Sequence, residues 1–124
     1  MPTYNVTASA TAGPLNVGLK IDGQRMPISH DADGNWIMSG TAVSSKNPVP
    51  YEFRAIGIST SKTTLKIALK AQDGSGSGSV SPDPLVIPDN GLLISPGTIA
   101  ITKVASPRIL GDLFDIDGNQ KGAS

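Results

Sequence analysis

The chain has 124 residues, a length that suits one domain with its own core, and it contains no cysteine, which excludes disulfides, zinc-thiolate sites and thiol nucleophiles. Ten basic and ten acidic residues cancel without a long run of either sign. Such a balanced surface gives nucleic acid no electrostatic footprint to bind, so we expect no nucleic-acid partner.

The N-terminal part of the chain alternates apolar and polar side chains with a period of two, which is the pattern of a strand with one buried face. Residues 4–10 (YNVTASA) and 15–21 (LNVGLKI) each place their apolar side chains on one side. Asp22 and Gly23 follow the second run, and glycine supplies the positive φ that a tight hairpin needs. The sequence therefore predicts two strands, the second entering a hairpin at Asp22–Gly23.

Two further alternating runs occupy the middle of the chain. In residues 64–70 (TLKIALK), Leu65, Ile67 and Leu69 oppose the lysines. In residues 51–58 (YEFRAIGI), the aromatic side chains share one face, but the isoleucines at 56 and 58 fall on the other. That change of face predicts either a bulge or a strand covered on both sides.

Glycine and serine dominate residues 72–84 (QDGSGSGSVSPDP), which contain few apolar side chains. This composition predicts a flexible loop at about residues 73–82; the alternative is an engineered splice of the kind that replaces a loop or joins earlier termini. Only about forty residues follow, too few for a second core, so we expect one domain over residues 1–124.

Short apolar runs bounded by Pro, Gly, Asn or Asp fill the rest of the chain, and no sustained helical stripe occurs. The run 108–116 contains Gly111 and could include one helical turn. The whole pattern predicts an all-β protein of about eight to ten strands, arranged as an antiparallel β-sandwich of immunoglobulin-like or jelly-roll-like architecture, with a small β-barrel as the alternative. The runs are 84–88 (PLVIP), 91–95 (GLLIS), 98–104 (TIAITKV) and 108–116 (RILGDLFDI).

The motif Asp-x-Asp-Gly-Asn begins at Asp31 and again at Asp115. Asp31, Asp33 and Asn35 offer oxygen ligands of the kind that calcium prefers. The bend glycine of an EF-hand loop is absent, because the next residue is a tryptophan in the first copy and a glutamine in the second. A hairpin turn is therefore the favoured interpretation, and a partial calcium site completed by neighbouring loops is the alternative.

Trp36, the only tryptophan, directly follows the first acidic motif. A tryptophan at the start of a strand is more often a packing residue than a binding plate, so we expect core packing. If the loop binds a ligand such as a sugar, the site consists of Asp31, Asp33, Asn35 and Trp36.

No catalytic constellation can be nominated. His30 is the only histidine, and in a strand it faces away from its neighbours Ser29 and Asp31, so the three do not make a hydrolytic triad. Glu52 is the only glutamate, and no facing pair of carboxylates is evident. We expect no enzyme activity.

The function that requires the fewest special residues is a structural or interaction module, used for adhesion, decoration or assembly in multiple copies, with a protein partner or a second copy of itself. The alternative is a lectin-like, carbohydrate-binding module, assisted by calcium through residues 31–36; no other cofactor is expected. No segment predicts a signal peptide or a membrane span. The sequence therefore indicates a soluble protein, compatible with an extracellular or virion surface, and fixes no compartment.

Overall fold

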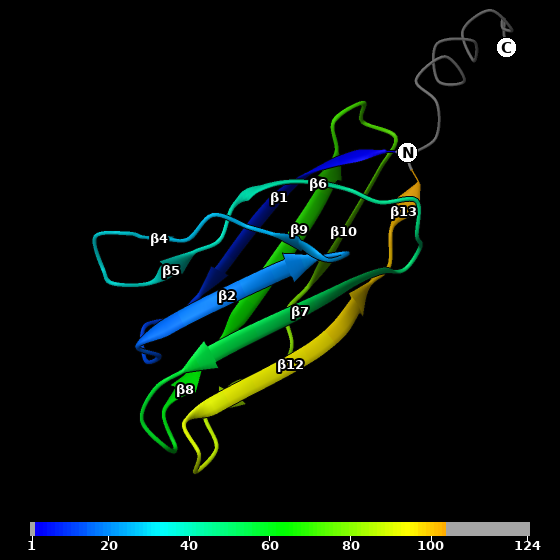
Figure 1. Ribbon diagram of the computed structural model, residues 1–124. Helices are drawn as coiled ribbons and strands as arrows, with labels where there is room; N and C mark the ends of the chain where they lie inside the picture. The colour runs from blue at the N-terminus through cyan, green and yellow to red at the C-terminus, as the bar shows by residue number, and fades with distance from the viewer. Residues whose placement is uncertain (1, 104–124) are drawn as a thin grey trace, which may run out of the picture.

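The computed structural model describes residues 2–103 (Figure 1), and every regular element in this part of the chain is a β-strand. Since this part holds no helix, it holds none with the length and apolarity to cross a membrane. The second acidic motif (Asp115, Asp117 and Asn119) and the run 108–116 lie outside the described residues. The strands are, in chain order, β1 (Thr3–Ala10), β2 (Asn16–Ile21), β3 (Gln24–Arg25), β4 (Ser29–His30), β5 (Trp36–Ile37), β6 (Gly40–Val43), β7 (Val49–Ile56), β8 (Lys62–Thr63), β9 (Leu65–Ala71), β10 (Gly76–Val80), β11 (Leu85–Val86), β12 (Leu92–Ile99) and β13 (Thr102–Lys103).

The strands form two antiparallel sheets packed face to face, together with the short pair β8–β11. The large sheet has the order β13-β10-β9-β1-β5-β4, and β6 also pairs with β1; the small sheet has the order β12-β7-β2-β3. Figure 1 shows β2, β7 and β12 in front of β1, β9 and β10. The predicted all-β antiparallel sandwich is confirmed, and the alternative of a barrel is wrong for the described residues, whose sheets do not close on themselves.

The core lies between the sheets and is supplied by the alternation that the sequence shows. On β1, β2, β7 and β9 every second side chain is buried, while its neighbours are half-buried or exposed. Phe53 and Leu65 are fully buried between the sheets. The predicted hairpin is also confirmed: Asp22 and Gly23, at φ 46° and 79°, connect β2 to β3.

The predicted flexible loop at about residues 73–82 is wrong for Gly76–Val80, which form β10 between β9 and β13. The Gly-Ser alternation is itself a strand pattern here, because the serines are exposed while the glycines face inward. A Cβ on Gly78 would lie 2.1 Å from the Ala100 carbonyl oxygen. Glycine therefore occurs here because another part of the backbone passes too close for any side chain.

The backbone that passes over β10 connects the two sheets. β12 is one strand through Pro96, although the sequence predicts two separate runs here, and a proline is tolerated because β12 is an edge strand. After β12 the chain crosses to the large sheet at Ala100. The Asn47 side chain secures the crossing: its Nδ2 donates to the Ile101 carbonyl (3.0 Å) and its Oδ1 accepts from the Ile101 amide (3.0 Å).

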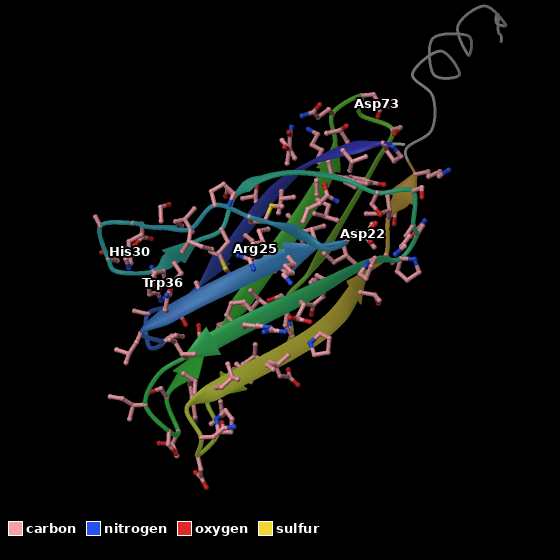
Figure 2. The ribbon with its side chains drawn as sticks, in the orientation of Figure 1. Asp22, Arg25, His30, Trp36 and Asp73 are labelled. Atoms are coloured by element: carbon pink, nitrogen blue, oxygen red, sulfur yellow. The ribbon has the colours of Figure 1, made fainter. Side chains whose placement is uncertain are left out.

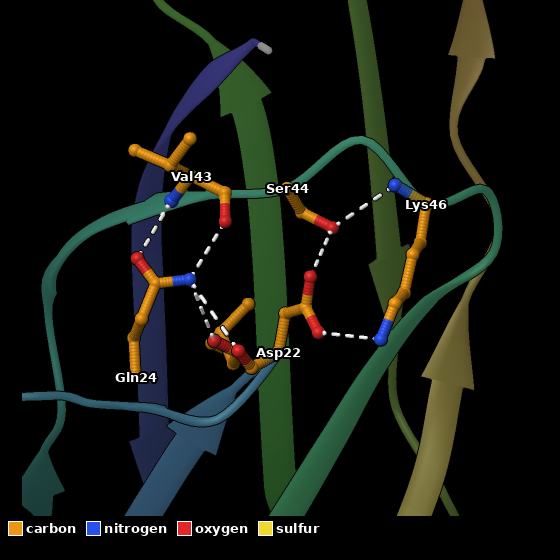
Figure 3. A network of polar contacts seen from close by, with 6 residues as sticks. Asp22, Gln24, Val43, Ser44 and Lys46 are labelled. Atoms are coloured by element: carbon orange, nitrogen blue, oxygen red, sulfur yellow. Dashed lines mark hydrogen bonds and ion pairs between the residues drawn. The ribbon is translucent and has the colours of Figure 1, made fainter.

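A polar network ties the opposite margin of the sandwich (Figure 3). The Asp22 carboxylate, at the β2–β3 turn, accepts hydrogen bonds from Ser44 Oγ (2.7 Å) and Lys46 Nζ (3.0 Å). The hydrogen bond from Ser44, followed by that from Lys46, lowers the pKa of Asp22. The turn of the small sheet is thus attached to the segment that follows β6 of the large sheet.

Candidate interaction surface

The acidic motif at residues 31–35 forms the turn between β4 and β5, as its favoured interpretation predicts. Asp31 Oδ1 accepts hydrogen bonds from the amides of Asp33 (2.9 Å) and Asn35 (3.0 Å), and Gly34 has a positive φ of 82°. Partial desolvation raises the pKa of Asp31, but the hydrogen bonds from Asn35 and Asp33 outweigh it, so the pKa lies below its ordinary value. The Asp31 carboxylate therefore organises the backbone of its own loop.

The Asn35 side chain is also engaged. Its Nδ2 donates to Asp31 Oδ2 (3.2 Å), and its Oδ1 accepts from the amide of Ala12 in the loop that follows β1 (3.1 Å). Asp33 is exposed at the tip. The structure thus brings Asp31 and Asn35 into contact, and residues 2–103 contain no group of three or more histidine and carboxylate side chains that could hold a metal ion.

Trp36 packs into the molecule, which confirms the core-packing interpretation. It is 8% exposed, and its Nε1 donates to the Pro14 carbonyl (3.2 Å). The His30 ring lies against it with the ring centroids 4.0 Å apart. Figure 2 shows both rings on the β4–β5 hairpin. An aromatic side chain that stacks on a sugar must expose the face of its ring, and little of the Trp36 side chain is exposed.

A more open surface lies on the outer face of the small sheet, which is the face turned away from the large sheet. Strand register aligns its outward side chains in rows, because directly paired residues of neighbouring strands share a face. From one end, the rows are Asn16, Ile56 and Leu92, then Gly18, Arg54 and Ile94, then Lys20, Glu52 and Pro96.

The middle and third rows border a hollow of about 390 Å³, lined by residues of β2, β3 and β7 that include Gly18, and by Met26 and Ile28 after β3. Gly18 opens it: a Cβ built on this residue would meet no atom within 4 Å. A second, shallower hollow adjoins it and shares Gly18 and Arg54 in its lining. The missing side chain of Gly18 thus leaves a recess in an otherwise continuous sheet face.

Positive charge dominates the rim of this hollow. Lys20, Arg25 and Arg54 line it with a single carboxylate, that of Glu52, which forms an ion pair with Arg54. Figure 2 shows Arg25 beside β2. Although the whole chain is neutral, this part of its surface is locally basic.

Aliphatic side chains adjoin the basic rim. Ile56, Leu92 and Ile94 on neighbouring strands form an apolar band and are 47%, 38% and 48% exposed. Ile58, just beyond β7, is 69% exposed. The outer face of the large sheet differs, because the outward side chains of β9 and β10 there are lysine, alanine and serine. Ile56, Leu92 and Ile94 thus lie together on two paired strands of the small sheet, whereas the large sheet exposes Val43 on β6 (37% exposed).

Part of this apolar band was visible in the sequence. The isoleucines at 56 and 58 fall on the polar side of their run, which predicted a bulge or a strand covered on both sides. The prediction is wrong for the described residues: β7 pairs regularly through Ile56, without a bulge, and the outward side chain of Ile56 is exposed. The sequence did not identify Gly18, because a glycine in a strand pattern does not reveal which side chains surround it.

No protein-family model, curated protein or solved structure matches this chain. The candidate surface is therefore interpreted from its own geometry and chemistry.

Proposed function

We propose that this protein is a non-catalytic interaction module that assembles in multiple copies through the outer face of its small sheet. The observation that carries the proposal is the apolar band of Ile56, Leu92 and Ile94 beside the basic hollow at Gly18. Contiguous exposed aliphatic side chains rimmed by polar groups are typical of surfaces that bind other proteins.

The rigidity of this face supports the proposal. Its side chains stand on three paired strands, so little backbone entropy would be lost when a partner binds. Burying a fully exposed aliphatic side chain contributes about 1.5–3 kcal/mol. Because the band is already half covered, a single contact would be modest in affinity, which suits a module that works through several copies.

The contrast between the two sheets also supports the proposal. A solvent-facing sheet usually carries polar outward side chains, and the large sheet does so with Lys66, Lys70, Ser77 and Ser79. The small sheet departs from that pattern at the apolar band. Three adjacent exposed aliphatic side chains favour a contact surface over the chance exposure of a single residue such as Val43 on the large sheet.

The test is sedimentation velocity of the intact protein over about 1 to 200 µM, a range in which contacts of micromolar affinity are detected. We expect wild type to associate as concentration rises and Ile94→Lys to remain monomeric. The matched control is Val43→Lys, which introduces the same charge at an exposed aliphatic residue of the large sheet, and it should associate like wild type.

Two results would overturn the proposal. One is a wild-type protein that stays monomeric throughout the range. The other is an association that Ile94→Lys and Val43→Lys weaken equally, since the small sheet would then have no special part in it.

A further inference from the structure

We propose that the occupant of this surface is residues 108–117 of a neighbouring copy, which dock across the basic hollow and the apolar band. The inference rests on the proposed function and names the partner segment. The segment reads RILGDLFDID and combines three aspartates with five large apolar side chains. It therefore has the two chemical properties that the outer face of the small sheet would select.

Charge complementarity is the first argument. Three cationic side chains, Lys20, Arg25 and Arg54, surround the hollow, against one carboxylate. The segment carries Asp112, Asp115 and Asp117 against a single arginine, Arg108. Opposite local charges on two parts of one chain steer copies together and fix the register in which they meet.

Spacing is the second argument. Arg54 and Ile56 are two residues apart on β7 and point to the same side, so their side chains are separated by about 7 Å along the strand. Asp112 and Phe114 are also two residues apart, and an extended segment would present them at the same interval. One docked register can thus place a carboxylate at the hollow and an aromatic ring on the apolar band.

The position of Lys103, the last described residue, is the third argument and favours a neighbouring copy. Lys103 belongs to β13, at an edge of the large sheet, whereas the docking face belongs to the small sheet. Figure 1 shows β13 at the end of the molecule opposite to the loop after β7, where the apolar band lies. A segment that continues from this end suits a copy placed end to end with the first. Because segment and face are different surfaces, copies linked one to the next build a ring or a filament, and two copies that exchange segments build a closed dimer.

The test is a charge exchange in the full-length chain, read by sedimentation velocity at low and physiological salt. Arg54→Glu and Asp112→Arg should each weaken association at least about tenfold, and the double variant should recover most of it. The matched controls are Lys66→Glu, on the outer face of the large sheet, and Asp83→Arg, in an exposed connection, and both should behave like wild type. If Arg54→Glu fails to fold, Arg25→Glu makes the same change on the exposed side chain of β3.

The outcomes separate the two proposals. If Ile94→Lys abolishes association but Asp112→Arg does not, another occupant covers the face, and the segment is overturned while the proposed function stands. If wild type is monomeric and Asp112→Arg changes hydrogen exchange on β2 and β7, the segment docks within its own copy, which overturns docking between copies. If a peptide of residues 106–119 fails to compete with an association that depends on Ile94, the segment is again overturned.

Discussion

The side-chain amide of Gln24 pairs with the backbone of Val43 as a strand residue would. Its Nε2 donates to the Val43 carbonyl (2.7 Å), and its Oε1 accepts from the Val43 amide (2.9 Å). Gln24 belongs to β3 of the small sheet and Val43 to β6 of the large sheet, so the pair joins the two sheets (Figure 3). Asn47 and Ile101 make the equivalent pair at the other margin.

Replacing Gln24 by alanine should therefore destabilise the protein by about 1–2 kcal/mol, because two hydrogen bonds are lost and the Val43 groups are left without these partners. The free energy of unfolding in urea measures the effect. Gln72→Ala removes a single exposed side-chain contact, that with Asn5, and should stay within about 0.5 kcal/mol of wild type. Equal losses for the two variants would contradict a special role for the Gln24 pair.

Stability should fall in acid partly through Asp22. The hydrogen bonds from Ser44 and Lys46 hold its pKa below the ordinary value of 3.8. A carboxyl whose pKa is lower in the folded state stabilises the protein above its unfolded pKa, and this contribution is lost as the pH falls through the folded pKa.

The measurement compares wild type with Asp22→Asn in urea unfolding between about pH 5 and pH 2. Asparagine keeps the turn, because it tolerates the positive φ at this position. The variant should be less stable than wild type at pH 5, and the difference should shrink in acid. Asp83→Asn, a matched change in an exposed connection, is the control and should match wild-type stability at pH 5.

Two glycines in strands should respond oppositely to the same substitution. Gly78→Ala should cost about 1–3 kcal/mol, because the new methyl group would collide with the Ala100 carbonyl. Gly18→Ala should raise the free energy of unfolding by about 0.5–1 kcal/mol, because its methyl group meets open space and alanine restricts the unfolded chain. Thermal unfolding measures both changes in stability. A Gly78→Ala protein as stable as wild type would contradict the close approach of the Ala100 carbonyl to β10.

The turn at residues 31–35 gives a prediction that separates structure from calcium binding. Asp31→Ala should lower the melting temperature, because the carboxylate holds the Asp33 and Asn35 amides, whereas Asp33→Ala at the exposed tip should change it little. Millimolar calcium should leave both wild type and variants unchanged. A saturable calcium-dependent rise in the wild-type melting temperature that Asp33→Ala removes would instead favour the calcium-assisted, carbohydrate-binding alternative.

The fold was predictable because apolar and polar side chains alternate with a period of two through most of the described chain. The prediction from sequence was wrong where tertiary contacts determine burial. Leu15 alternates in phase with Val17 and was placed on the same face, yet it precedes the first residue of β2 and is 68% exposed. Gly76–Val80 looked flexible, because the reason for each glycine is a backbone segment more than twenty residues away in the chain.

The candidate surface was harder to predict than the fold. Its rows depend on which residue of β7 stands opposite which residue of β2 and β12, and this register is fixed by packing between strands that are distant in sequence. The site was predicted at the acidic motif because the residues of that motif are adjacent in the chain. Gly18, Arg54 and Ile94 are adjacent only after folding.

Pro96 affects whether the edge of the small sheet can pair with a strand of another molecule. It sits within β12, an outermost strand of the small sheet, and it has no amide hydrogen to offer an incoming strand. Natural proteins use prolines in such strands to discourage runaway polymerisation into amyloid-like ribbons. A strand arriving at this edge would therefore lack a hydrogen-bond donor at Pro96, which lowers the tendency of two molecules to join their sheets there.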